Sequence, residues 1–307
     1  MDRRRFNLML GTSLAMSTRA WGAGEVFLGY DQKAVDDAYD QTKWAPNARE
    51  MVARYATDSA EVRKKYPPKT ERYGDSEVEN LDIFAPQGAQ DLPVMVFIHG
   101  GAWRSLSKDD TSGPAPTFVD NGCIFIALNF GAIPAVRLPE IAQQCRAAML
   151  WVYKNIARFG GDPNRIFVAG RSSGGHLCAV VATTDWTKRG GPANLLKGAV
   201  AMSGMYELYP VMLSQRSSYV KLSPEEVSDL SPLRHMDQIT FPVMVVNGDK
   251  ESPEFQRQAH VFADVLAGMN RLSSHMVVTG KNHFEVPQDL NNAGTDLSKA
   301  VLKLMKG

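Results

Sequence analysis

Short apolar runs recur along the chain and alternate with stretches in which apolar residues return at helical spacing. The runs are PVMVFIHG (93–100), CIFIALNF (123–130), RIFVAG (165–170), LKGAVAMSG (196–204), PVMVVNG (242–248) and HMVVTG (275–280). Continuous runs of this length are typical of strands covered on both faces. The stretches 138–158 and 253–269 and the final segment AGTDLSKAVLKLMK predict amphipathic helices. This alternation predicts an α/β protein with a mostly parallel, doubly wound sheet and helices on both faces.

The rest of the chain after the first 23 residues completes this picture. Helical patterns around 33–41 and 46–55 precede two short strand-like segments, TERYG and ENLDIFAP, which bring the sheet to about eight strands. The segment 206–238 breaks the alternation, because it is polar and interrupted by prolines. We expect residues 24–307 to form one domain, with 206–238 as a small insertion over the carboxyl edge of the sheet. Ligands bind at that edge in such sheets.

Residues 1–23 have a different character. A basic start is followed by a short, moderately apolar stretch and then by small residues, which is the layout of a secretory signal. The Arg3-Arg4-Arg5-Phe6 segment resembles a bacterial twin-arginine signal, which is a receptor-read address and no membrane anchor. We therefore predict export to the periplasm, with cleavage near Ala20 or Ala23. The alternative is a basic leader on a cytosolic protein.

Composition narrows the class of protein further. The 307 residues carry 34 basic and 33 acidic side chains, so no global field favours nucleic acid or a membrane surface. The three cysteines, Cys123, Cys145 and Cys178, lack CxxC spacing and are interpreted as small buried hydrophobes. The chain contains neither an HExxH motif nor a phosphate-binding GxxxxGK[ST] loop. We predict no metal, no organic cofactor and a small-molecule substrate, and the sequence does not indicate an oligomeric state.

The segment VAGRSSGGHL contains the strongest chemical signal. Gly170-Arg171-Ser172-Ser173-Gly174 fits the pattern GxSxG, and it stands between a predicted strand and a helical pattern. A sharp strand-to-helix turn of this kind lifts a serine above the sheet edge. It also places Ser172 at a helix N-terminus, where developing negative charge is favoured. We predict Ser172 as a nucleophile, with a purely structural glycine turn as the alternative.

A second glycine pair follows an earlier strand, in FIHGGAW (97–103). Backbone N–H groups in such a loop can stabilise an oxyanion, and we assign this role by position to Gly101 and Ala102, together with Ser173 after the nucleophile. His99 precedes the serine in the chain and is interpreted as a brace for the loop. Trp103 is interpreted as a wall of the substrate pocket.

A serine nucleophile needs a histidine base and an acid that orients it, in the chain order serine, acid, histidine. Only His283, in VVTGKNHFEV, lies in a loop after a late strand, from which it could reach Ser172. The other histidines after Ser172 are in helical, strand-interior or insertion positions: His176, His235, His260 and His275. The acid should follow the strand PVMVVNG, where Asp249 and Glu251 share one loop. Either carboxylate could hold an imidazole.

Together, HGGAW, GRSSGGH, NGDKESPEF and NHF resemble the α/β-hydrolase superfamily from about Tyr30 to the C-terminus. More narrowly, they are similar to the arylformamidase (kynurenine formamidase-like) branch, close to hormone-sensitive-lipase-type esterases. The resemblance places the acid three residues after the glycine that ends the strand, which favours Glu251 over Asp249. Two positions depart from the family pattern: Arg171 stands where His, Asp or Glu is more frequent, and Ser173 where Ala is.

These features predict a serine hydrolase that works through an acyl-enzyme intermediate. The fold and the export signal favour carboxylic esters, whereas the arylformamidase resemblance implies aryl amides, formamides or carbamates as the alternative. Trp103, Phe130 and Tyr206 could line a pocket for an aromatic group. A relative that binds ligands without catalysis is a more remote alternative.

Overall fold

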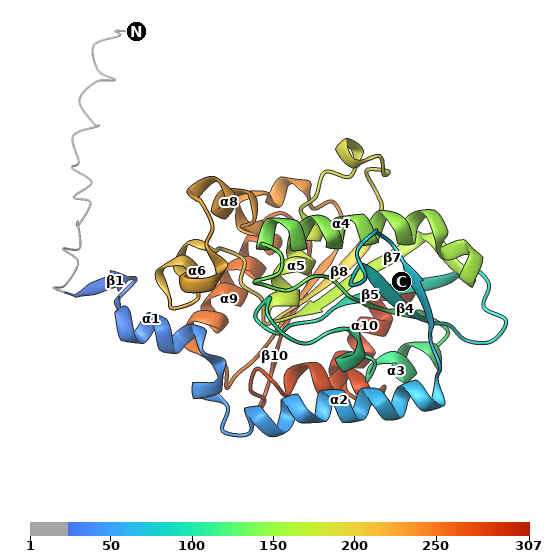
Figure 1. Cartoon of the computed structure of the whole chain (residues 1–307), viewed down its shortest axis with the longest axis horizontal. Helices are drawn as coiled ribbons and strands as arrows, with labels where there is room; N and C mark the ends of the chain where they lie inside the picture. The colour runs from blue at the N-terminus through green and yellow to red at the C-terminus, as the bar shows by residue number, and fades with distance from the viewer. Residues whose placement is uncertain (1–23) are drawn as a thin grey trace, which may run out of the picture.

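An eight-stranded sheet forms the centre of the molecule in the computed structural model, which describes residues 24–307 (Figure 1). The predicted export signal lies outside these residues. The strand order is β10-β9-β8-β7-β5-β6-β4-β3, in which β4 pairs antiparallel with both of its neighbours, β3 and β6, and all other neighbouring strands are parallel. The bounds are β3 Lys69–Arg72, β4 Asn80–Phe84, β5 Leu92–Ile98, β6 Ile124–Leu128, β7 Gly161–Arg171, β8 Leu196–Met202, β9 Val243–Gly248 and β10 Leu272–Val278. The predicted mostly parallel sheet of about eight strands is confirmed.

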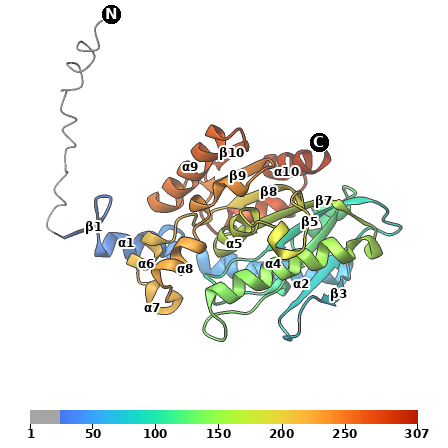
Figure 2. The same ribbon diagram turned by 90° about the horizontal axis from the view of Figure 1, so that it is seen from above.

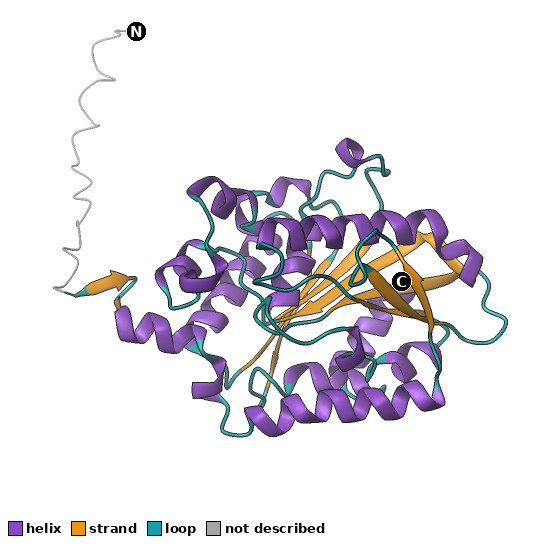
Figure 3. Cartoon of the chain, in the orientation of Figure 1, coloured by secondary structure: helices purple, strands orange, loops and turns teal. Residues whose placement is uncertain are grey.

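Helices cover both faces of this sheet (Figure 3). Alternate residues of β5 enter opposite layers: Val94, Val96 and Ile98 join one apolar cluster, whereas Met95 and Phe97 join the other. This is the two-residue period of a strand buried on both faces. The first cluster contains side chains of α4 (Leu138–Asn155), α5 (Ser173–Ala182) and α9 (Pro253–Gly268), and the second those of α3 (Ala115–Val119) and α10 (Asp296–Lys306). The cysteines are buried and free, as predicted.

The N-terminal part of the described chain forms a small hairpin and two helices. Strands β1 (Glu25–Phe27) and β2 (Tyr30–Asp31) pair antiparallel, and α1 (Gln32–Tyr39) and α2 (Ala48–Lys65) follow. Helix α2 extends beyond the predicted segment 46–55. The prediction relied on apolar residues at helical spacing, and the last turns of α2 lack them because they bury few side chains. No helix in residues 24–307 has the length and hydropathy of a membrane span.

The polar segment between β8 and β9 consists of short helices: α6 (Tyr209–Leu213), α7 (Ser217–Val220) and α8 (Pro224–Asp229). These helices lie close to α1 at one end of the molecule (Figure 2). Hydrogen bonds hold them there: Gln32 Nε2 donates to the Leu213 carbonyl oxygen at 2.8 Å, and the Gln215 N–H donates to Asp36 at 2.7 Å. This segment, residues 206–238, is called the insertion below.

A buried carboxylate joins the antiparallel edge of the sheet to α2. Asp82 in β4 has no exposed surface, and it accepts hydrogen bonds from Arg63, from Lys108 Nζ at 2.9 Å and from Thr70 Oγ1 at 2.5 Å. Burial alone would raise the pKa of Asp82, but the hydrogen bonds from Thr70, Lys108 and Arg63 outweigh it and lower the pKa below its ordinary value. Asp82 is therefore ionised and stabilises the fold at neutral pH.

Replacing this carboxylate should destabilise the protein. We predict that Asp82→Asn lowers the free energy of unfolding at pH 7 by about 3 kcal/mol, because it leaves Lys108 and the partly buried Arg63 with only the exposed Asp109 as an ionic partner among the described residues. Because the pKa is lowered by folding, the contribution of Asp82 is full above the ordinary aspartate range near pH 4 and is lost as the pH falls through the folded-state pKa. Urea unfolding at pH 7 measures the difference. The control is Glu61→Gln, which removes an exposed pair with Lys64. An equal, small effect of both substitutions would contradict the prediction.

Candidate active site

Ser172 lies at the turn between β7 and α5, in the backbone conformation that the GxSxG pattern predicts. Strand β7 ends at Arg171 and α5 begins at Ser173, while Ser172 itself has φ 55° and ψ −125°. A positive φ is uncommon outside glycine and persists only where the surroundings enforce it. Here the Ser172 N–H donates to the Met202 carbonyl oxygen at 2.9 Å, and the Ser172 carbonyl accepts from the His176 N–H at 3.0 Å. These bonds hold the turn between β8 and the first turn of α5.

The glycines around Ser172 are required by close backbone contacts. A Cβ atom on Gly174 would lie 2.2 Å from the Ile98 carbonyl oxygen, and one on Gly170 would lie 2.1 Å from the Gly174 carbonyl oxygen. Neither distance is compatible with a side chain. The helix start therefore packs directly on β5, which answers why the motif needs small residues on both sides of the serine.

The structure brings Ser172, His283 and Glu251 together from three loops at the carboxyl edge of the sheet. His283 Nε2 lies 2.8 Å from Ser172 Oγ, and His283 Nδ1 lies 3.2 Å from Glu251 Oε2. Glu251 follows β9 and His283 follows β10. Asp249, the alternative acid, points elsewhere: it is exposed and accepts from the Gly280 N–H at 2.8 Å. Of the two predicted carboxylates, only Glu251 contacts the imidazole.

Glu251 is held by donors on its second oxygen. Its side chain is buried, with 1% of the residue exposed, and Oε1 accepts from Ser203 Oγ at 2.6 Å and from the Gly248 N–H at 2.7 Å. Oε2 is thereby left to face His283. Ser203 was not predicted from the sequence. Its position directly after β8, at the same edge of the sheet, could have identified it.

The predicted oxyanion loop lies beside Ser172. Gly101 and Ala102 have φ of 106° and 53°, and the Trp103 N–H donates to Ser173 Oγ at 3.2 Å, which joins the loop to α5. In residues 24–307, the N–H groups of Gly101, Ala102 and Ser173 donate to no protein atom. Three backbone donors are therefore available next to the serine.

His99 braces this loop, in agreement with its predicted place. Its Nδ1 contacts the Gly100 carbonyl oxygen at 2.8 Å, which requires a proton on Nδ1, and its ring stacks on Phe130 at 4.1 Å. Burial is the main cause that lowers the pKa of His99 to about 4, and the positive charge of Arg171 adds to it. His99 is neutral at physiological pH and does not contact Ser172.

The three aromatic residues predicted for the pocket have different positions. Tyr206 has no exposed surface: its ring stacks on Phe262 at 4.1 Å, and its hydroxyl donates to the Ala201 carbonyl and accepts from the Gly204 N–H. It is a core residue and not a pocket wall, because these contacts occupy both its ring and its hydroxyl. Phe130 is buried, and its ring stacks on that of His99 at 4.1 Å. Trp103 belongs to the oxyanion loop, and its side chain is buried edge-on against His176, with 1% of the residue exposed.

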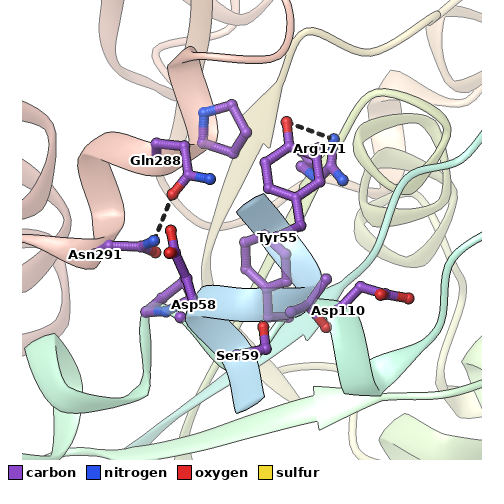
Figure 4. A pocket seen from close by; sticks show the side chains of 12 residues that line it. Tyr55, Asp58, Ser59, Asp110, Arg171, Gln288 and Asn291 are labelled. Atoms are coloured by element: carbon purple, nitrogen blue, oxygen red, sulfur yellow. Dashed lines mark hydrogen bonds between the residues drawn. The ribbon is translucent and has the colours of Figure 1, made fainter. Parts of the chain in front are cut away.

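Arg171, the departure from the family pattern, joins the serine turn to the histidine loop. The guanidinium lies 4.0 Å from the Tyr55 ring centroid, and Nη1 donates to the Tyr55 hydroxyl at 3.3 Å. The Tyr55 hydroxyl in turn donates to the carbonyl oxygen of Phe284, the residue after His283, at 2.5 Å. Figure 4 shows this contact at one wall of a pocket that Gln288 and Asn291 also line. Sequence reasoning could not find Tyr55, which lies on α2, far from any motif.

In residues 24–307, no group of three or more His, Cys, Asp or Glu side chains is arranged to hold a metal ion. The arrangement has the parts of acyl-transfer chemistry: a hydroxyl beside an imidazole, an imidazole beside a buried carboxylate, and free N–H donors beside the hydroxyl.

Two named relatives and one solved structure align with most of this chain. Kynurenine formamidase of Danio rerio is 27% identical over 280 residues, which cover 87% of this chain and 94% of that protein. Isoprenylcysteine alpha-carbonyl methylesterase of Arabidopsis thaliana is 25% identical over 248 residues, which cover 73% of this chain and 58% of that protein. The crystal structure of a candidate thioesterase from Silicibacter sp. TM1040 superposes with a TM-score of 0.77 at 24% identity, over 87% of this chain and 98% of that one.

The solved structure confirms the predicted α/β-hydrolase fold, and the named relatives confirm the predicted resemblance to formamidases and esterases and the prediction of a hydrolase. The BD-FAE family model matches residues 81–266, which include the oxyanion loop, Ser172 and Glu251. Because this match spans well over half of the chain, the protein belongs to the BD-FAE family.

Proposed function

We propose that this protein hydrolyses carboxylic esters with Ser172 as nucleophile, His283 as general base and acid, and Glu251 as the group that orients His283. The observation that carries the proposal is the continuous contact from Ser172 Oγ through the imidazole to a buried carboxylate. A carboxylate at Nδ1 keeps the proton on that nitrogen, which leaves the Nε2 lone pair to accept the serine proton.

In the first half-reaction, Ser172 Oγ attacks the carbonyl carbon of the ester while its proton moves to His283 Nε2. The carbonyl oxygen becomes an oxyanion, which the N–H groups of Gly101, Ala102 and Ser173 stabilise. The bond from carbon to the leaving oxygen then breaks, and His283 returns the proton to the alcohol. In the second half-reaction, water attacks the acyl carbon and gives a proton to His283. The bond from this carbon to Ser172 Oγ then breaks, His283 returns the proton to Ser172, and the carboxylic acid is released.

The relatives support ester hydrolysis and also a second candidate. An isoprenylcysteine methylesterase and a kynurenine formamidase both align with this chain. The alignment with the formamidase covers nearly its whole length, which favours an aryl formamide or amide as the second substrate class. The same serine chemistry serves both. If residues 1–23 act as the predicted export signal, the reaction takes place in the periplasm, and N-terminal sequencing of the mature protein from that compartment tests this.

A direct comparison of substrates tests the proposed function. We predict that 4-nitrophenyl acetate has a higher kcat/KM than N-formylaniline, and that Ser172→Ala lowers both values at least about 10³-fold, because the nucleophile is lost. The control is Ser76→Ala, at an exposed serine in the loop between β3 and β4, which should retain wild-type rates. Preference for the formamide would favour the second candidate. An active Ser172→Ala enzyme would contradict the proposal.

A second pair of variants tests which acid orients His283. We predict that Glu251→Gln lowers kcat for the ester by about 10³- to 10⁴-fold, because a neutral amide no longer stabilises the imidazolium or fixes its tautomer. Asp249→Asn should stay close to wild type, since Asp249 is exposed and its carboxylate accepts from the Gly280 N–H and not from His283. Circular dichroism confirms that both variants are folded. A large loss in Asp249→Asn with none in Glu251→Gln would exchange the two roles.

A further inference from the structure

Two arginines beside the oxyanion loop have no carboxylate partner in the described part of the chain. Arg104 directly follows Trp103, and its guanidinium lies 4.5 Å from the ring centroid of Tyr219. Arg216, in the insertion, lies 5.9 Å from the Trp103 ring centroid. Three other arginines in or near the insertion are paired with acids: Arg137 with Glu226, Arg234 with Glu207, and Arg257 with Glu254. Arg146 also lines a pocket with the insertion and donates to Thr184, so what distinguishes Arg104 and Arg216 is their position beside the oxyanion loop.

Arg216 lies close to both halves of the catalytic machinery. Its guanidinium is 6.0 Å from the ring centroid of Phe255, and the Phe255 ring meets His283 edge-on at 5.0 Å. On the other side, Trp103 belongs to the oxyanion loop and is bound through its N–H to Ser173. Arg216 is therefore separated from the oxyanion loop by the Trp103 ring and from His283 by the Phe255 ring.

The guanidinium of Arg216 is preorganised and still has donors to offer. Its Nε and Nη2 donate to the Tyr39 carbonyl oxygen at 3.0 and 2.6 Å, which fixes the plane of the group. Its Nη1 contacts only Met205 Sδ, at 3.5 Å, and a thioether sulfur is a weak acceptor. A side chain that is already ordered loses little entropy when a ligand binds.

Arg104 and Arg216 both lie beside Tyr219. The Arg104 guanidinium packs over the Tyr219 ring, and the Tyr219 N–H donates to the Arg216 carbonyl oxygen at 3.1 Å, one turn earlier in the insertion. Burial raises the pKa of the Tyr219 hydroxyl, and the positive charges of Arg216 and Arg104 both oppose that rise. The indole Nε1–H of Trp103 is also buried without an acceptor in the described residues.

We propose that Arg216 and Arg104 form a subsite for a carboxylate on the substrate, so that the natural substrates are esters or aryl amides that carry a second, anionic group. Guanidinium is the side-chain group best matched to a carboxylate, and charge-assisted hydrogen bonds are stronger than neutral ones. The inference rests on the proposed function, because it names the substrate class of the same site. In this proposal, the insertion selects substrates by their charge.

Matched ester pairs that differ only in charge test the subsite. The first pair is 4-acetoxybenzoate and 4-acetoxybenzamide, with the charge on the leaving group. The second is the mono-4-nitrophenyl ester of succinate and its terminal amide, with the charge on the acyl group. For each pair, kcat/KM for the anionic ester is divided by kcat/KM for the neutral ester. We predict that this ratio is about ten in at least one pair. The ratio should fall toward one in Arg216→Met and in Arg104→Met, and Arg216→Lys should keep part of it.

The control for the charge change is Arg158→Gln. Arg158 lies before the start of β7, whereas Ser172 lies after the end of this strand. The control therefore removes one positive charge at the opposite end of the sheet, and it should leave the ratio unchanged. Arg104→Met is the variant less exposed to misfolding, since the Arg104 side chain is exposed and, within residues 24–307, packs on Tyr219 without an ion pair.

A wild-type ratio near one in both pairs, or a ratio that neither arginine substitution lowers, would overturn the subsite while leaving the proposed function intact. If the wild type hydrolyses none of the four esters, the proposed function fails instead.

Discussion

The positive φ of Ser172 is the constraint on which the site depends. A serine in this conformation is held between β7 and α5 only because Gly170 and Gly174 allow the backbone to approach so closely. The same turn presents the Ser173 N–H beside the hydroxyl and places both at the start of a helix, where negative charge is favoured. All other groups of the site reach toward this one fixed point from loops that follow neighbouring parallel strands.

The polar contacts of the site are arranged around one buried carboxylate, that of Glu251. Donors contact one of its oxygens, and His283 lies against the other. His99, the other imidazole at the sheet edge, is kept neutral by burial and by the nearby Arg171, and serves only to hold the oxyanion loop. Arg171 itself is buried against Tyr55, and this contact links the turn at Ser172 to the loop that carries His283. The unusual arginine of the GRSSGG motif thus has a structural reason in this chain.

The sequence predicted the strands and the serine and histidine positions well because each has a local signal. An apolar run marks a buried strand, and a glycine-flanked serine between a strand and a helix marks the turn. The acid was different: Asp249 and Glu251 share one loop, and only the family resemblance favoured the residue that the structure places against His283. Local patterns also gave no means to find Tyr55 or Ser203, whose contacts come from distant parts of the chain. Tyr206 was predicted to line the pocket because it is an aromatic residue near the sheet edge, but its ring packs in the core against Phe262.

Covalent trapping with an organophosphonate would show whether Ser172 is the nucleophile. The full-length protein would be treated with a 4-nitrophenyl alkylphosphonate, and the modified peptide located by mass spectrometry after proteolysis. We expect one phosphonate per chain, attached to Ser172 and absent when Glu251 is replaced by Gln under the same brief exposure, because an unoriented imidazole does not activate the hydroxyl. Attachment to Ser173 or Ser203, or no attachment in an enzyme that still hydrolyses esters, would rule out Ser172 as the nucleophile.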